Sequence, residues 1–353
     1  MNINPLETKN YRKPKKKKKK KKALLLIPAA CICLVALWFL LPYHFVDSQG
    51  IKYKITSFST CRTAGVADSK ITELVIPNYA GKLEVTEIGK ESFSYCMSLT
   101  NVTIPDSVTS IGENAFAGCH SLTGVVIPDS ITSIDESAFF ACNSLQEIDI
   151  SDEVTSIGKM AFYGCESLAY VTFGKSLNYI GVSAFERCTS LTDVKILDFV
   201  SFIGDYAFKD CSSLTSVHID GNSDTTIGRL AFYQCPSLTS VYIGSGMSEV
   251  SDSAFYGCGA LTDLQISYNV TRIGNQAFRD CSALSDIKIP VSITSIERWA
   301  FLGCSSLDTV TYYGTISQWQ SISKDPEWDM DTGSYTVYCT DGTIDKSGKT
   351  TYR

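Results

Sequence analysis

Ten cysteines recur at a nearly constant interval and are the first candidates for chemistry. They are Cys96, Cys119, Cys142, Cys165, Cys188, Cys211, Cys235, Cys258, Cys281 and Cys304. A disulfide or a metal site needs a second cysteine or further ligands close in space, and no histidine accompanies this period. We expect these thiols to occupy equivalent buried sites as small apolar groups, with pairing between neighbouring cysteines as the alternative.

The other titratable residues form no recognisable catalytic or ligand pattern. The three histidines, His44, His120 and His218, are far apart, and the sequence contains no G-x-S-x-G, P-loop or H-E-x-x-H motif. Acids such as Glu147 and Asp149 fall on expected strands whose outward side chains face open solvent. A hydrated carboxylate there lacks the desolvation that raises the pKa of a catalytic acid. The sequence therefore predicts no catalytic, cofactor-binding or metal-binding residue, and a protein that is not an enzyme.

A repeat of 23 residues positions the cysteines. Phenylalanine precedes each cysteine by three residues and leucine follows it by three, and the one 24-residue step separates Phe208 from Phe232. Between leucine and the next phenylalanine, Leu-x-x-Val-x-Ile alternates like a half-buried strand. A second extended segment follows, as at Val108 and Ile111, and then a single 3₁₀ or α turn around Phe116.

One such coil cannot bury its own apolar face, but stacked coils can. The period lies in the range typical of leucine-rich solenoids. With parallel strands ~4.8 Å apart, ten repeats would give a rod roughly 50 Å long. We therefore predict a solenoid of parallel strands and short turns over residues 71–312.

The repeat resembles a known family. Its pattern, Leu-x-x-Val-x-Ile-Pro-x-x-Val-Thr-x-Ile-Gly-x-x-Ala-Phe-x-x-Cys, is similar to that of the BspA-like leucine-rich repeat proteins of bacterial surfaces. The resemblance implies a surface-exposed binding protein, with adhesion to host or matrix proteins in some members, and no catalytic residue.

The N-terminal region predicts a membrane anchor. Residues 23–41 carry no charge, which is long enough for a transmembrane helix, and residues 1–22 contain eleven lysines or arginines and one acid. The positive-inside rule places this tail in the cytoplasm and the repeats outside the cell. A cleaved signal peptide, or a lipoprotein modified at Cys31, is the alternative. The rest of the chain has 36 acids and 20 basic residues, which argues against nucleic-acid binding.

Caps and linkers complete the expected organisation. Residues 42–50 are predicted as a linker, residues 51–70 as an N-terminal cap and residues 313–353 as a C-terminal cap and tail. Ile316 and Trp319 indicate a short amphipathic helix over the last coil.

Two side chains per coil should point outward from the Leu-x-x-Val-x-Ile strands onto one open face. These positions vary whereas the core positions do not, as expected for a fixed scaffold that a partner recognises. The candidate partner-binding residues are Glu147, Asp149, Tyr170, Asp193, Lys195, His218, Tyr242 and Asp263. The sequence thus favours protein binding at the cell surface, including adhesion. The alternatives are an envelope scaffold near its own membrane, and a merely solvated face.

Overall fold

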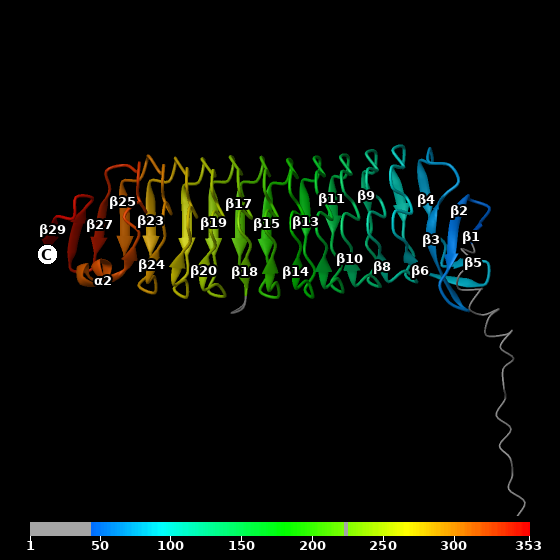
Figure 1. The fold of residues 1–353 in the computed structure, drawn as a ribbon, viewed down its shortest axis with the longest axis horizontal. Helices are drawn as coiled ribbons and strands as arrows, with labels where there is room; N and C mark the ends of the chain where they lie inside the picture. The colour runs from blue at the N-terminus through cyan, green and yellow to red at the C-terminus, as the bar shows by residue number, and fades with distance from the viewer. Residues whose placement is uncertain (1–43, 222–224) are drawn as a thin grey trace, which may run out of the picture. The chain divides into compact units, whose positions relative to one another are not determined.

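The computed structural model describes residues 44–221 and 225–353, which form successive coils stacked in one row (Figure 1). The predicted leucine-rich-repeat solenoid is confirmed, with about 12 turns of about 23 residues rather than the ten predicted. The cytoplasmic tail and transmembrane helix predicted for residues 1–41 lie outside the described residues. Among the helices that are described, none has the length and apolar character needed to cross a bilayer.

One side of the stack, here called the first face, is formed by the Leu-x-x-Val-x-Ile strands. Their bounds are β4 (Glu73–Val75), β7 (Asn101–Thr103), β9 (Gly124–Val125), β11 (Glu147–Asp149), β13 (Tyr170–Thr172), β15 (Asp193–Ile196), β17 (Ser216–Ile219), β19 (Ser240–Ile243), β21 (Asp263–Ile266), β23 (Asp286–Ile289) and β25 (Thr309–Tyr312). In β15, Val194 and Ile196 are buried whereas Asp193 and Lys195 are exposed, as the alternation predicts.

The opposite side, the second face, carries two-residue parallel strands after β6 (Leu83–Ile88). They are β8 (Ser110–Ile111), β10 (Ser133–Ile134), β12 (Ser156–Ile157), β14 (Tyr179–Ile180), β16 (Phe202–Ile203), β18 (Thr226–Ile227), β20 (Glu249–Val250), β22 (Arg272–Ile273), β24 (Ser295–Ile296) and β26 (Ser323–Lys324). The second extended segment predicted for each repeat is therefore present. Each strand buries an aliphatic side chain, except β26, where Lys324 takes that position.

The segment around each phenylalanine differs from the predicted 3₁₀ or α turn. In the coil of Phe185, Ser183 and Arg187 have left-handed φ angles of 55° and 62°. The N–H groups of Ser183, Phe185 and Arg187 donate to carbonyls of the next coil, whereas those of Glu186 and Cys188 donate within their own coil. A helical turn would direct consecutive N–H groups along its own axis, so it could not join neighbouring coils in this way.

The core contains one continuous column of phenylalanine rings. Ten phenylalanines, one per repeat from Phe93 to Phe301, are fully buried. Neighbouring ring centroids are 5.1–5.5 Å apart and the ring planes differ by 1–17°. Each inner ring therefore has both of its faces covered by its two neighbours, and the predicted apolar column is confirmed.

A cysteine column runs beside the rings. Nine of these thiols, from Cys119 to Cys304, each donate to the carbonyl of the phenylalanine one coil earlier, with S···O distances of 3.1–3.4 Å. Burial raises the thiol pKa of Cys119 and Cys165 to about 12. Each cysteine thus fills a small apolar site, as predicted from the sequence. It also donates a hydrogen bond to a buried carbonyl, and the sequence did not predict this second role.

The N-terminal cap begins earlier than the sequence predicts. β2 (Ile51–Ile55) pairs with β3 (Thr60–Val66), as expected for a capping strand, but β1 (His44–Val46) also pairs with β2. Phe45 stacks on Tyr53, with ring centroids 5.2 Å apart. Residues 44–46 therefore belong to the cap rather than to the linker predicted over residues 42–50.

The C-terminal cap contains the predicted amphipathic helix, α2 (Ile316–Ser321), which buries Ile316 and Trp319. Thr315 and Gln318 form a capping box at its start. Trp328 ends the phenylalanine column by packing edge-on against the ring of Phe301, with ring centroids 5.9 Å apart. β27 (Thr336–Cys339), β28 (Gly342–Asp345) and β29 (Thr350–Tyr352) extend the last ladder of the first face.

We expect Phe185→Ala to lower the free energy of unfolding by about 3–5 kcal/mol, because it leaves a cavity in a column that cannot close without shifting whole coils. Phe199→Ala, at a side chain that is 49% exposed, should change it by less than about 0.5 kcal/mol. Denaturant unfolding of the full-length chain in mild detergent measures both. Equal effects of the two substitutions would contradict a stability carried by the ring column.

We also expect the column cysteines to resist iodoacetamide at pH 8, because their thiols are buried, and burial also raises the pKa of Cys188 well above its usual value. Peptide mass spectrometry before and after denaturation measures the labelling. Ser212→Cys places a thiol at an exposed position next to Cys211 and should react in the native protein. Labelling of Cys188 at the rate of that control would show that the column opens.

Candidate binding face

All eight candidate residues lie on the first face, and register aligns them in two rows. In one row, Glu147 pairs with Tyr170, and Asp193 is joined to Asp263 through two serines. In the other row, Lys195, His218, Tyr242 and Gln265 are consecutive register partners. The eight residues therefore lie on the same face. The strand ladder is interrupted between β13 and β15, and this interruption divides them into two groups.

The first group comprises Glu147, Asp149 and Tyr170. Tyr170 is 64% exposed and lies directly beside Glu147. The hydroxyl of Thr172 donates to the carboxylate of Asp149, which fixes that carboxylate across two coils. This group therefore offers an aromatic ring beside two anionic side chains on a rigid pair of strands.

The second group comprises Asp193, Lys195, His218, Tyr242 and Asp263. The His218 and Tyr242 rings stack with centroids 4.4 Å apart and an interplanar angle of 14°. His218 Nε2 lies 2.8 Å from a carboxylate oxygen of Asp220, which orients the imidazole. The carboxylates of Asp193 and Asp263 each accept a hydrogen bond from a serine of the adjacent coil. The stacked rings are consequently held in one orientation.

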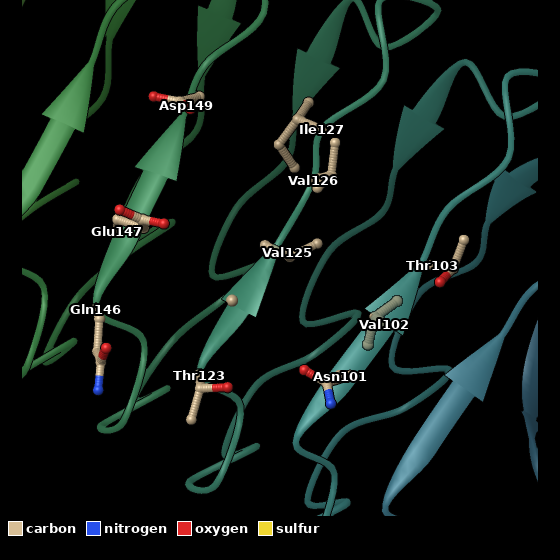
Figure 2. Close-up of a pocket in the computed structure, with 11 residues that line it drawn as sticks. Asn101, Val102, Thr103, Thr123, Val125, Val126, Ile127, Gln146, Glu147 and Asp149 are labelled. Atoms are coloured by element: carbon tan, nitrogen blue, oxygen red, sulfur yellow. The ribbon is translucent and has the colours of Figure 1, made fainter.

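A shallow hollow of about 530 Å³ lies where the ladder is interrupted between β9 and β11. Figure 2 shows Glu147 and Asp149 on one strand, Asn101 and Thr103 two coils away, and Val126 between them. Gly124 leaves the middle of the hollow open, because a side chain there would meet no other atom within 4 Å. Two candidate acids thus line a depression that their sequence positions did not predict.

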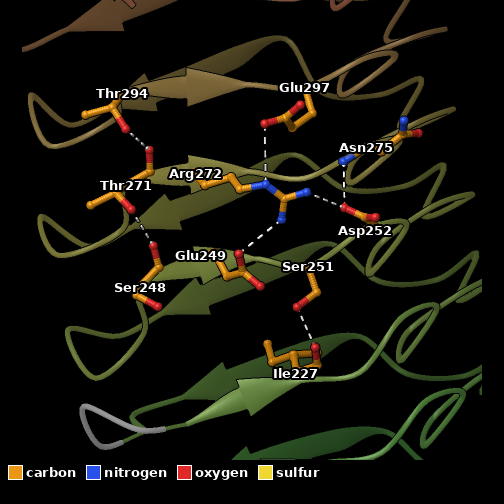
Figure 3. A network of polar contacts seen from close by, with 10 residues as sticks. All are labelled: Ile227, Ser248, Glu249, Ser251, Asp252, Thr271, Arg272, Asn275, Thr294 and Glu297. Atoms are coloured by element: carbon orange, nitrogen blue, oxygen red, sulfur yellow. Dashed lines mark hydrogen bonds and ion pairs between the residues drawn. The ribbon is translucent and has the colours of Figure 1, made fainter. Parts of the chain in front are cut away.

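The second face uses its charges differently. Arg272 bonds the carboxylates of Glu249 and Asp252 at 3.1 and 2.8 Å and lies 3.4 Å from a carboxylate oxygen of Glu297 (Figure 3). Its guanidinium therefore joins three successive coils. Among the described residues, one ion pair, between His218 and Asp220, involves a side chain of the first-face strands, and a second, between Lys175 and Asp152, lies just after them. The polar groups of the first face are less occupied in holding coils together.

Exposed apolar side chains of this face that were not among the predicted residues include Val126, Tyr268 and Tyr313. Val126 is 78% exposed, Tyr268 is 71% exposed and Tyr313 is 57% exposed. Tyr268 and Tyr313 follow their strands rather than lying within them, so an analysis of the two outward strand positions omits them. The sequence feature that could have identified Tyr268 and Tyr313 is an aromatic residue just after the strand of an otherwise regular repeat.

The described residues contain no group of three or more histidine, cysteine, aspartate or glutamate side chains arranged to hold a metal ion. Burial raises the thiol pKa of Cys142 and Cys211, which makes these cysteines poor nucleophiles and poor ligands. The features of this face are exposed rings, carboxylates and amines on a rigid scaffold, which suit binding.

The fold and its face define a leucine-rich repeat protein, a class that typically binds other molecules without catalysis. The family description "BspA type Leucine rich repeat region" matches residues 86–215 and 201–323. The chain therefore belongs to the BspA-type leucine-rich repeat family, and the resemblance noted from the repeat is confirmed.

The chain is also similar to several solved structures. A leucine-rich repeat protein from Bacteroides ovatus is 25% identical, with a TM-score of 0.43, and the match covers 84% of this chain and 100% of that one. A leucine-rich cell-surface protein from Faecalibacterium prausnitzii is 26% identical, with a TM-score of 0.38 and coverage of 81% and 98%. The pneumococcal vaccine antigen PcpA is 17% identical, with a TM-score of 0.50 and coverage of 83% and 98%. No curated protein matches the chain.

Proposed function

We propose that the chain is a membrane-anchored extracytoplasmic protein whose first face binds a protein partner at the cell surface, with adhesion as its role. The observation that carries this proposal is the first face itself. Its exposed rings and charges are held in fixed register, yet few of them take part in ion pairs between coils. A rigid face with available side chains loses little conformational entropy on binding.

The side chains of this face favour a partner with basic and aromatic groups. Tyr170 and Tyr242 are the anchors, because aromatic residues dominate the energetics of protein interfaces. Glu147 is exposed and has no cationic partner among the described residues, so it is available to a lysine or arginine. The cell-surface description of the Faecalibacterium relative supports the proposed location.

A second candidate function, an envelope scaffold near its own membrane, is favoured by the early start of the N-terminal cap. If residues 23–41 anchor the chain, only residues 42 and 43 precede β1. Two residues span at most about 7 Å, which leaves almost no stalk. A partner bound by this protein would then lie within reach of the same membrane.

We expect Tyr170→Ala combined with Tyr242→Ala to weaken partner binding by at least about tenfold, because both changes remove interface anchors. Partners are captured on the full-length chain in nanodiscs, identified, and titrated against purified variants. Tyr79→Ala combined with Tyr95→Ala removes two exposed rings outside the face and should leave the affinity unchanged. An unaltered affinity in the first double variant would remove the first face as the site.

We expect the mature protein to remain with membranes after alkaline carbonate extraction, because an apolar span of nineteen residues supports stable insertion. Mass spectrometry of the mature N-terminus should still find the lysine run at residues 15–22. Protease treatment of intact cells then tests exposure beyond the envelope: cleavage supports adhesion, whereas protection supports the scaffold. A soluble product that begins after residue 41 would contradict the anchor.

A further inference from the structure

A second hollow, of about 440 Å³, lies at the ends of the first-face strands in the later coils. The side chains and backbone that surround it are Tyr242, Gln265, Ile266, Ser267, Tyr268, Lys288 and Tyr313. Three of these seven residues are tyrosines, and they come from three different coils. The hollow is therefore a broad aromatic surface rather than an enclosed pocket.

The tyrosine rings are available to a ligand and partly fixed in place. Tyr268 and Tyr313 are largely exposed. Tyr242 has one ring face covered by His218, which leaves its orientation set by that stack. Flat, exposed rings at the rim of an open depression bind flat, weakly polar surfaces best, such as the C–H faces of a pyranose ring.

Polar groups lie among these rings. The side-chain amide nitrogen of Gln265 donates to the carboxylate of Asp263 at 3.2 Å, so the amide oxygen remains as an acceptor. Ser267 supplies a hydroxyl that can donate or accept. Aromatic rings with a few interspersed hydrogen-bonding groups are the usual composition of a small-molecule site.

The only charged side chain of the hollow is Lys288, which is exposed. Other lysines of the solenoid, such as Lys159 and Lys175, pair with an acid of the neighbouring coil at 3.0 and 2.7 Å. No described carboxylate lies within 4.0 Å of Lys288, although Asp286 precedes it on the same strand. The hollow thus offers an unpaired cation, which disfavours cationic ligands and favours an anionic group.

The backbone also opens at this place. Ser267 donates to the carbonyl of Ile243 at 2.9 Å, which joins β21 to the coil before it. The equivalent position of the next coil is Pro290, which has no N–H, so this bond is missing between Pro290 and Ile266. The ladder is interrupted between β21 and β23, and the hollow lies at that interruption.

We propose that this hollow binds an extracellular oligosaccharide that carries uronic-acid residues. Sugar rings pack against Tyr268, Tyr313 and the exposed edge of Tyr242, hydroxyl groups bond Gln265 and Ser267, and a carboxylate pairs with Lys288. The shallow, open shape fits a chain that passes across the face, and the single cation fits one carboxylate per site. This inference rests on the proposed function in one respect, because it requires the first face to lie outside the cytoplasm. The hollow and the proposed protein-binding site have Tyr242 in common.

The test uses the full-length chain in nanodiscs and three defined probes: trigalacturonate, a hyaluronan tetrasaccharide and trimannuronate. Calorimetry should detect millimolar or tighter binding of at least one of them. Its methyl-esterified form keeps the rings but lacks the charge, and should bind about tenfold more weakly. Tyr268→Ala should weaken both forms by about tenfold, since stacking does not depend on charge.

Lys288→Gln separates recognition from a structural role. It should abolish the preference for the acid over its ester and leave binding of the ester unchanged, whereas a merely structural lysine would affect both equally. Tyr79→Ala, at an exposed tyrosine in the first coil, should change neither. No binding of any probe below about 10 mM, or binding that survives both Tyr268→Ala and Lys288→Gln, overturns the proposal.

The outcome is independent of the protein-binding function. A chain that retains its protein partner but binds no uronate loses only this inference. A chain that binds uronate with loss at Tyr268→Ala, yet retains its protein partner after Tyr170→Ala and Tyr242→Ala, loses only the proposed protein site. Competition between the protein partner and the uronate would place both ligands on one surface.

Discussion

Contact between equivalent side chains of successive coils is the constraint on which the whole solenoid depends. Each coil buries its leucine, phenylalanine and cysteine only because the next coil presents the same residue one step further along. The ring spacing of 5.1–5.5 Å is close to the ~4.8 Å that separates hydrogen-bonded strands. Backbone ladders and aromatic stacking therefore require nearly the same rise per coil, and neither strains the other.

The exposed surface inherits this regularity. A residue on the first face has its position fixed by a buried neighbour on either side, as Lys195 has from Val194 and Ile196. The two faces differ in their ion pairs. On the second face, charged side chains such as Arg272 form ion pairs between coils, whereas Lys288 on the first face has no carboxylate partner among the described residues. Binding capacity arises where the scaffold leaves side chains unused.

The sequence predicted the core columns, both caps and the alternation of the first-face strands, because those features repeat ten times or follow simple periodicity. It did not predict the left-handed residues beside each phenylalanine. Those positions hold residues as different as Glu91, Ser183 and Trp299, so no single residue type marks them. The cysteine-to-carbonyl bond was equally hidden, since it joins residues 26 positions apart in neighbouring coils.

For the candidate site, the sequence placed eight residues on one face, and the structure aligns them there. It could not show where the ladder is interrupted, because Pro128 occupies the same repeat position as Pro290 and β7 still pairs with β9. Nor did it reveal Tyr268 and Tyr313, because they lie beyond the strands that were compared. Hollows between strands depend on which backbone bonds are absent, and the alternation of side chains carries little information about that.

The repeat structure limits how the distance between two hollows of the first face can change in evolution. Because each coil adds about the same rise, the separation between the acidic hollow near Gly124 and the aromatic hollow near Tyr268 is a whole number of coils. Gaining or losing one 23-residue unit between them would move the two surfaces apart or together by a single fixed increment while leaving each intact. The reach between two ligands on this protein is therefore adjustable only in discrete steps.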